Sequence, residues 1–424
     1  MMRTLYSLAI GCYTLVIRLA SPFHPKARQM VQGWRRSLHA LENCASDSER
    51  QPLLWFHASS LGEFEQARPV LEQLRADHPG HRICITFFSP SGYEVRREYP
   101  FADLVMYLPP DTRRNARRLV ENLRPGVVFF VKYDFWFNYL DALQRKHVPV
   151  YIFSAIFRPS HYFFKPYGKW FREQLKRCFT HIFVQNQESL QLLRNYGINQ
   201  CSRAGDTRFD RVKAIADGAQ PNPAVERFAR LHKDCTLLIA GSSWPPDERL
   251  LQRYMIAQQQ RPLCLVLAPH VINASHLDDI VRLFGKEQCV RYSRLEHVAD
   301  EELARRSVLV VDNIGMLASL YRYARTAYIG GGWGHGIHNI LEAVTFGKPV
   351  LFGPNHKKFQ EAKDILACGG GFAHCNYEEL EAQLNLLLDD NERYRAASDA
   401  CLRYVAQNIG STQTILANIH LPEQ

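Results

Sequence analysis

Short apolar runs alternate with longer amphipathic stretches along most of the chain. The apolar runs have the length and β-branched content of buried parallel strands, and the stretches between them have the period of helices. Predicted strands in the first half are residues 53–57, 82–88, 104–107, 126–131, 148–153 and 181–184. The pattern restarts with strands at residues 235–240, 263–268, 307–311, 326–329 and 348–352. This alternation predicts an α/β protein with two parallel sheets, each covered by helices on both faces.

A break in this alternation divides the chain near residues 212–223. An Asp-Gly pair and a Pro-Asn-Pro triplet lie there, and both are turn or linker signals. The predicted division is an N-terminal segment of residues 1–35, a Rossmann-like domain of 36–212, a linker of 213–232, a second Rossmann-like domain of 233–410, and a C-terminal helix or tail of 411–424. Because open α/β sheets bind ligands at the carboxyl ends of their strands, we expect the two domains to face a central cleft.

The most informative stretch runs from Tyr328 to Pro354. Its pattern predicts a strand, a glycine-rich turn, the start of a helix and a second strand. Five glycines lie in the turn: Gly330, Gly331, Gly332, Gly334 and Gly336. Glycine lets a backbone turn tightly and approach a ligand closely. The turn is therefore a candidate ligand site.

Asn339 opens the predicted helix, and asparagine is a favoured helix cap. A helix that starts after a glycine loop offers free N–H groups and a positive dipole end to an anion. Glu342 lies three residues further on, on the same helix face, where its carboxylate can accept hydrogen bonds from a sugar diol. A glycine-rich turn without a ligand is the simpler alternative. A dinucleotide fingerprint fits poorly, because that motif normally follows the first strand of its domain.

Other strands of the second half also end in polar or glycine-containing turns, which are candidate nucleotide contacts. These turns hold Gly241, Ser242 and Ser243, then Pro269 and His270, then Asn313, Gly315 and Met316. Gly315, in a strand-to-helix turn, can present its N–H to phosphate. His270 and His338 can bind phosphate or be structural, which is the more common role of a single histidine. Lys358 either binds an anion or belongs to a solvated lysine pair.

Two carboxylates follow strands of the first half. Glu63 is expected in the first turn of a helix, where it either acts as a general base toward a hydroxyl or complements the helix dipole. Asp134 lies in the segment from Lys132 to Asn138, after the most apolar strand. Trp136 in the same segment provides an aromatic wall or a core side chain.

The N-terminal residues 5–17 form an apolar run that is shorter than the roughly 20 residues of a membrane-spanning helix. Arg18, Lys26, Arg28, Arg35 and Arg36 follow it. An apolar segment followed by basic residues is typical of a monotopic anchor on an anionic leaflet. A secretory signal peptide and a surface helix packed on the protein itself are the alternatives.

Composition narrows the function class. Hydrophobic residues make up 46% and charged residues 22%, which is typical of a globular protein. The net charge of +10 favours anionic partners, but no nucleic-acid motif is present, so nucleic acid is not expected as a partner. The 11 cysteines form no CxxC pair, which favours reduced thiols, and no metal-ligand spacing occurs. The chain lacks the G-x-S-x-G elbow of serine hydrolases and the phosphate loop of P-loop proteins.

Several stretches together resemble the 3-deoxy-D-manno-octulosonic acid (Kdo) transferases of lipopolysaccharide synthesis. The similar stretches are residues 57–63, 86–92, 107–111, 204–210, 241–243, 330–342 and 346–354. The resemblance implies a GT-B fold, with an acceptor-binding first domain and a CMP-sugar-binding second domain. It also implies inverting transfer of Kdo from CMP-Kdo to a lipid A precursor without metal or cofactor, and an anchor on the cytoplasmic face of the inner membrane.

The resemblance also implies residue roles. Glu63 would be the general base, with Asp134 as a second catalytic carboxylate. Asn339 and Glu342 would hold the ribose and phosphate region of CMP. Arg208 and Lys358 would pair with the Kdo carboxylate.

The sequence departs from the family pattern at three places. Lys132 replaces an acidic residue, His270 follows Pro269 without the usual arginine, and Ile337 replaces a glycine. The alternatives are another GT-B enzyme that uses a UDP-sugar on a lipid acceptor, and a non-catalytic membrane-bound nucleotide-binding protein.

Overall fold

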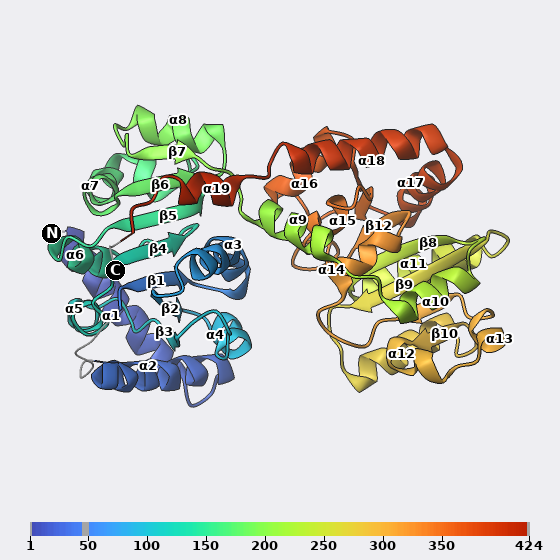
Figure 1. Ribbon diagram of the computed structural model, residues 1–424, viewed down its shortest axis with the longest axis horizontal. Helices are drawn as coiled ribbons and strands as arrows, with labels where there is room; N and C mark the ends of the chain where they lie inside the picture. Colours follow the sequence, from blue (N-terminus) through green and yellow to red (C-terminus); the bar gives the residue numbers. More distant parts are fainter. Residues whose placement is uncertain (1, 45–50, 422–424) are drawn as a thin grey trace. The chain divides into compact units, whose positions relative to one another are not determined.

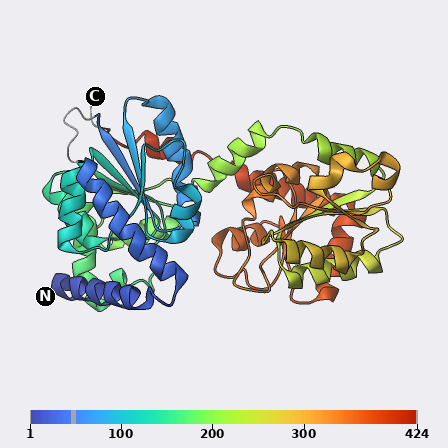
Figure 2. The same ribbon diagram turned by 90° about the horizontal axis from the view of Figure 1, so that it is seen from below.

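The computed structural model describes residues 2–44 and 51–421 of the chain. The chain divides into two compact units (Figure 1). Unit 1 comprises the residues up to Asp210 together with the C-terminal segment from Ile409, and unit 2 runs from Arg211 to Asn408. Each unit holds a seven-stranded sheet in which every strand pair is parallel, and helices cover both faces (Figures 1 and 2). The predicted α/β class with two Rossmann-like sheets is confirmed.

The first sheet has the strand order β3-β2-β1-β4-β5-β6-β7. Its strands are β1 Leu53–Ala58, β2 Arg82–Phe87, β3 Leu104–Tyr107, β4 Val127–Val131, β5 Val150–Ala155, β6 His181–Val184 and β7 Cys201–Arg203. From β1 the chain moves outward through β2 and β3, then returns to the other side of β1 to form β4. The strand order therefore reverses between β1 and β4, which is the place where open α/β sheets bind ligands.

The helices that accompany this sheet are α1 Met2–Ala20, α2 Pro25–Cys44, α3 Leu61–Asp77, α4 Pro90–Arg96, α5 Arg113–Leu123, α6 Phe137–Arg145, α7 Lys169–Cys178, α8 Gln187–Asn195 and α19 Ser411–Leu416, with 3₁₀ turns at Tyr162–Phe164 and Pro166–Gly168. Side-chain caps begin several of them. The Thr112 side chain accepts from the N–H of Asn115 at the start of α5, and Asn186 does the same for Ser189 at α8.

The core of unit 1 consists of two apolar layers, one on each face of the sheet. Trp55 of β1 packs into one layer, whereas Leu54 and Phe56 pack into the other. This alternation follows from the period of two in a strand. Because both faces are covered, all six residues of β1 are buried, and the strand is a continuous apolar run apart from His57.

The second sheet has the order β10-β11-β9-β8-β12-β13-β14. Its strands are β8 Thr236–Ser243, β9 Leu263–Pro269, β10 Cys289–Arg291, β11 Val308–Val310, β12 Thr326–Ile329, β13 Val350–Phe352 and β14 Gly371–Ala373. The order reverses between β8 and β12. The edge strands β7, β10 and β14 were not predicted, because their sequences, Cys-Ser-Arg, Cys-Val-Arg and Gly-Phe-Ala, contain no run of apolar β-branched residues.

Unit 2 contains α10 Pro223–Leu231, α11 Pro245–Ala257, α12 Ala274–Phe284, α13 Asp300–Leu303, α14 Leu317–Leu320, α15 Leu341–Val344, α16 Gln360–Ala367, α17 Tyr377–Asp389 and α18 Asn391–Ala406, with 3₁₀ turns at Tyr292–His297 and Tyr321–Tyr323. Helix α9, Arg208–Gly218, begins in unit 1 and continues into unit 2.

The unit boundary differs from the one expected from sequence. It lies between Asp210 and Arg211, inside α9, and the segment predicted as a linker, residues 213–232, carries the rest of α9 and all of α10. The C-terminal segment returns to unit 1, where α19 lies beside the first sheet (Figure 1). The Asp210 carboxylate accepts hydrogen bonds from the N–H groups of Gly410 and Thr412, both at 2.6 Å, and Ile415 is buried in the core.

Helices α1 and α2 pack on each other and lie at one side of unit 1 (Figures 1 and 2). Two polar contacts tie α1 to the unit. The Tyr6 hydroxyl donates to the buried Asp111 carboxylate at 2.5 Å, and Arg3 forms an ion pair with Asp141 at 2.5 Å. No single described helix is long and apolar enough to cross a membrane; Met2–Ala20 and Pro25–Glu42 meet that length and composition only as a pair bent by 116°.

Candidate active site

Glu63 and Asp134 follow the two strands between which the order of the first sheet reverses. Glu63 lies in the first turn of α3, directly after β1. Asp134 lies in the loop between β4 and α6. β1 and β4 are hydrogen-bonded neighbours, so their carboxyl ends meet at one edge of the sheet. The structure thus brings the two predicted catalytic carboxylates into one site.

Asp134 is a buried carboxyl group held by Ser59. The Ser59 N–H donates to Oδ2 at 3.0 Å, and the Ser59 hydroxyl donates to Oδ1. Burial, followed by the negative charge of Glu63, raises the pKa of Asp134 well above its usual value, against the opposing effect of the Ser59 hydrogen bonds. Asp134 therefore retains its proton to higher pH than an exposed aspartate.

Glu63 is half-buried, and its pKa is set by a different combination of effects. Burial raises its pKa, whereas the positive charge of Lys132 and hydrogen bonds from Ser60 and Ser59 lower it by a smaller amount. The Ser60 hydroxyl donates to Oε2 at 3.2 Å. Two neighbouring carboxyl groups whose environments differ can take different roles. The arrangement can accept a proton from a bound hydroxyl.

Lys132 occupies a strained backbone position at the end of β4. Its φ is 63°, in the left-handed region that non-glycine residues seldom adopt. The Lys132 N–H donates to the carbonyl of Phe153 at 3.0 Å, so the position is fixed by the neighbouring strand. Sequence comparison with the family pattern marked Lys132 as a departure, and the structure gives the departure an electrostatic role beside Glu63.

His57 forms the floor of this site, and the sequence did not mark it as a site residue by itself. Its Nε2 accepts a hydrogen bond from the Trp136 indole at 3.0 Å, so Nδ1 carries the proton and faces Thr86 at 2.8 Å. Burial lowers the pKa of His57 to about 3, against the opposing hydrogen bond with Thr86. The imidazole is therefore neutral, although its Nε2 lies 3.7 Å from Asp134.

In unit 2, β8 and β12 are also hydrogen-bonded neighbours, so the turns that follow them meet at one edge of the second sheet. The Gly330 N–H donates to the carbonyl of Gly241 at 2.9 Å. A Cβ on Gly330 would lie 2.2 Å from the carbonyl oxygen of Ser242, so glycine is required there by close backbone approach. Ser243 pairs with Pro269 across β8 and β9, and the structure therefore brings these predicted donor contacts together.

A buried carboxylate that the sequence did not reveal supports this half-site. Asp247, at the start of α11, accepts hydrogen bonds from the N–H groups of Trp244 at 2.9 Å and Gly331 at 3.0 Å. It also accepts from the Tyr328 hydroxyl at 2.9 Å. Burial raises its pKa, against the opposing hydrogen bonds. Asp247 thus fixes the glycine turn to the end of β8.

Three aromatic side chains from separate turns form a stack. The His270 ring stacks on both of the others, on the Trp244 ring at 4.9 Å and 27° and on the His338 ring at 4.2 Å and 24°. The Trp244 indole donates to Nε2 of His338 at 3.0 Å. Burial and the neighbouring His270 lower the pKa of His338 to about 4, and burial lowers that of His270. The stack is therefore uncharged at neutral pH, and Trp244 and His270 are exposed at its outer side.

The helix predicted to open at Asn339 begins two residues later. Helix α15 covers Leu341–Val344, and an anion at its start stays a prediction. The N–H groups of Gly334 and Gly336 donate to the carbonyl of Gly331, because the turn folds on itself. The Asn339 side chain still caps locally: its oxygen accepts from the N–H of Leu341 at 3.1 Å.

Asn339 and Glu342 are in contact, as their spacing predicts. The Asn339 amide donates to the Glu342 carboxylate at 2.9 Å. Both side chains are half-buried. Burial and then the charge of Glu342 raise the pKa of Tyr321, whose hydroxyl occupies the space into which a Cβ on Gly241 would project. Glu342 therefore belongs to the same end of the sheet as Gly241.

The remaining predicted residues have other surroundings. Asn313, Gly315 and Met316 lie in the loop between β11 and α14, and Gly315 has a φ of 99° with open space around its Cα. The Arg208 guanidinium pairs with Asp206 in unit 1, with Nε and Nη2 at 3.0 and 2.7 Å from Oδ2. The Lys358 ammonium donates to the carbonyl of His335 and so braces the glycine turn.

Comparisons with known proteins agree with this geometry. Residues 32–211 match the family model described as 3-deoxy-D-manno-octulosonic-acid transferase (kdotransferase). The 3-deoxy-D-manno-octulosonic acid transferase of Aquifex aeolicus is 26% identical over 82% of this chain and 88% of its own length. The enzyme of the same name from Haemophilus influenzae is 26% identical over 97% of this chain and 96% of its own.

Solved structures support the fold. The UDP-GlcNAc 2-epimerase of Neisseria meningitidis, solved with UDP-GlcNAc bound, matches 87% of this chain and 99% of its own with a TM-score of 0.59 at 15% identity. A putative UDP-N-acetylglucosamine 2-epimerase of Listeria monocytogenes matches 88% and 99% with a TM-score of 0.57 at 12% identity. Two Rossmann-like units, each with a seven-stranded parallel sheet whose strand order reverses, give the chain a GT-B-like fold. The match over residues 32–211, together with relatives aligned over most of the chain, makes this chain similar to the Kdo transferases along most of its length.

Proposed function

We propose that this protein transfers Kdo from CMP-Kdo to a lipid A precursor, with inversion at the anomeric carbon. The observation that carries the proposal is the carboxyl pair Glu63 and Asp134 at the reversal of strand order in unit 1. Similarity to the Kdo transferases supports the sugar class.

In the proposed reaction, ionised Glu63 takes the proton from the acceptor hydroxyl. The hydroxyl oxygen then forms a bond to the anomeric carbon, while the bond from that carbon to the CMP phosphate breaks and CMP leaves. A raised pKa makes Glu63 a stronger base than an exposed glutamate, and the Lys132 charge favours its ionised form. Asp134 positions the turn that precedes Glu63 through Ser59.

The donor is assigned to unit 2. We place the cytosine base against the exposed side of the Trp244–His270–His338 stack, because bases stack on uncharged aromatic surfaces. The turn from Gly241 to Ser243 would approach the nucleotide, and the Asn339–Glu342 pair would accept the ribose hydroxyls. That both units face one cleft remains a prediction.

Helix α1 is proposed as the anchor on the cytoplasmic face of the inner membrane. Its polar contacts through Arg3 and Tyr6 point into unit 1, whereas most of its exposed residues are apolar. The exposed apolar side chains are Leu5, Leu8, Leu15, Val16, Leu19 and, just after the helix, Phe23. An exposed apolar face of this kind favours a helix that lies in the interface rather than across it.

A transfer assay tests the function. Purified protein would receive a lipid A precursor and CMP-Kdo generated in situ, with UDP-sugars in parallel reactions, and product mass would count the sugars added. We expect product from CMP-Kdo that is lost in Glu63→Gln, with CMP binding retained. Glu65→Gln, on the same helix but paired with Arg96, is the matched control and should stay active. Product from UDP-sugars alone would contradict the proposal.

A further inference from the structure

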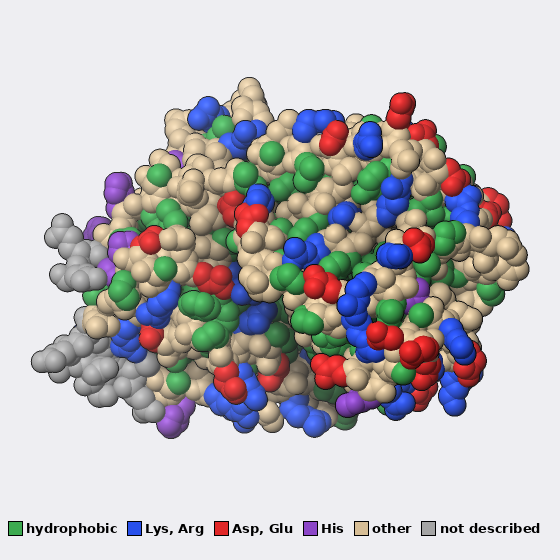
Figure 3. All heavy atoms as spheres, turned by 45° about the vertical axis from the view of Figure 1, so that its right-hand side comes forward, with side chains coloured by type: hydrophobic (Ala, Val, Ile, Leu, Met, Phe, Trp, Pro, Cys, Tyr) green, Lys and Arg blue, Asp and Glu red, His purple; other side chains and the backbone are tan. Residues whose placement is uncertain are grey.

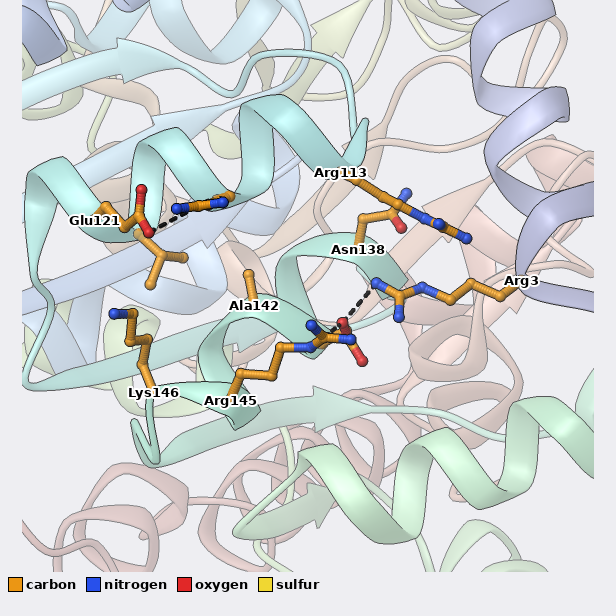
Figure 4. Close-up of a pocket in the computed structure, with 10 residues that line it drawn as sticks. Arg3, Arg113, Glu121, Asn138, Ala142, Arg145 and Lys146 are labelled. Atoms are coloured by element: carbon orange, nitrogen blue, oxygen red, sulfur yellow. Dashed lines mark hydrogen bonds and ion pairs between the residues drawn. The ribbon is translucent and has the colours of Figure 1, made fainter.

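A basic cavity of about 330 Å³ lies in unit 1 between α5 and α6, beside the first turn of α1 (Figure 4). Cationic side chains from all three helices line it: Arg3, Arg113, Arg117, Arg145 and Lys146. Its acidic lining residues are Glu121 and Asp141. In the view of Figure 4, Arg3 and Arg113 lie at one end of the cavity and Lys146 with Glu121 at the other. Glu63 and Asp134 are not among its lining residues.

The two acidic side chains are already neutralised. Asp141 accepts from Arg3 at 2.5 Å, from Arg145 at 3.0 Å and from Arg177 at 2.8 Å. Glu121 pairs with Arg117 at 2.8 Å. Three arginines on one buried carboxylate exceed what its charge requires. The cavity therefore has an excess of positive charge.

Two of the lining cations have no acidic side chain that neutralises their charge in the described part of the chain. Neither the Arg113 guanidinium nor the Lys146 ammonium has a hydrogen-bond or ion-pair partner among residues 2–44 and 51–421. Both side chains are exposed to solvent at the cavity. Elsewhere, charges of both signs are interspersed, as the face in Figure 3 shows. The cavity is thus a local concentration of donors for an oxyanion.

We propose that this cavity binds the phosphate group of an anionic phospholipid headgroup. Arginine and lysine donors that converge from several directions suit the oxygens of a phosphate. Arg3 belongs to the helix whose outward side is apolar from Leu5 onward, so the cavity lies beside the segment assigned to the membrane interface. This inference rests on the proposed attachment through α1, and the headgroup contact would fix the rotation of unit 1 on the membrane.

Vesicle co-sedimentation tests the proposal with the full chain. Vesicles of phosphatidylcholine alone would be compared with vesicles that also contain phosphatidylglycerol. We expect wild-type protein to bind the second kind more tightly, which we call the phosphatidylglycerol gain. In Arg113→Gln/Lys146→Gln this ratio of affinities should fall by about tenfold or more. The matched control is Lys233→Gln/Arg249→Gln, which removes the same charge from exposed cations of unit 2 that have no partner in the described part of the chain. The control should keep the gain.

Three outcomes would overturn the proposal. The first is a phosphatidylglycerol gain that persists in Arg113→Gln/Lys146→Gln. The second is an equal loss in the control, which would assign the effect to net charge. The third is no lipid dependence in wild-type protein, combined with a rise in melting temperature in inorganic phosphate that the double variant lacks; free phosphate would then be the ligand. Attachment through α1 is judged separately, because Leu8→Glu/Leu19→Glu should abolish binding to both kinds of vesicle.

Discussion

The negative charge of Glu63 raises the pKa of Asp134, although the two residues belong to different strand-to-helix loops. The loops meet because β1 and β4 are neighbours in the sheet. One carboxyl group is half-buried and lies near a lysine, and the other is buried and held by a serine. Burial raises the pKa of both groups, and the charge of Lys132 opposes that rise at Glu63.

The first prediction concerns Asp134 and stability. A carboxyl whose folded-state pKa is raised stabilises the fold fully below its unfolded value, about 4, and loses that contribution as pH rises through the folded value. Asp134→Asn keeps an oxygen acceptor for Ser59 but cannot ionise. Its free energy of unfolding should therefore fall less than that of wild-type protein as pH rises above about 4. Urea unfolding across this pH range measures the difference, and parallel curves would contradict the prediction.

The second prediction concerns Lys132 and the pH dependence of transfer. The Lys132 charge lowers the pKa of Glu63, so Lys132→Met should move the acidic limb of the kcat/KM profile to higher pH. Lys132→Arg keeps a positive charge at the same left-handed backbone position, so its acidic limb should lie at the wild-type pH. A limb that does not move in Lys132→Met would show that Glu63 is not the titrating base.

The third prediction concerns the aromatic stack. If the base of CMP stacks on His270, His270→Ala should raise the Kd for CMP by roughly tenfold, since one stacked base contributes about 1–3 kcal/mol. Calorimetric titration with CMP measures this. His297→Ala, an exposed histidine in a 3₁₀ turn, is the control and should bind CMP as wild-type protein does. Equal affinity in both variants would remove the stack from the donor site.

The fourth prediction concerns backbone contact between the turns after β8 and β12. Gly330→Ala would place a Cβ 2.2 Å from the Ser242 oxygen, and separating the two backbones should cost about 1–3 kcal/mol of stability. Gly334→Ala is the matched control in the same turn, because its Cβ would meet nothing closer than 3.8 Å. Denaturant unfolding should show a large loss for the first variant and a small one for the second.

Much of the fold could be predicted from sequence because buried parallel strands leave a local mark. The strand limits at His181–Val184 and Thr326–Ile329 match their predictions residue for residue. The glycine turn was also identifiable, since its five glycines lie within seven residues of the chain. Asp247 was not, because a helix-start aspartate is common and only folding brings the Gly331 N–H and the Tyr328 hydroxyl to it. The start of α15 at Leu341, two residues after Asn339, was not predicted.

The sequence by itself determined the α/β class, the positions of most strands and the candidate residues at their carboxyl ends, because hydrophobic period and glycine placement act over a few residues. Only the tertiary structure decided which strands are neighbours. That choice places Asp134 against Glu63 and His338 against His270, and it gathers the basic side chains of α1, α5 and α6 around one cavity. Burial and Coulomb interaction depend on distance in space, so the pKa of each site residue was set by folding and not by its neighbours in the chain.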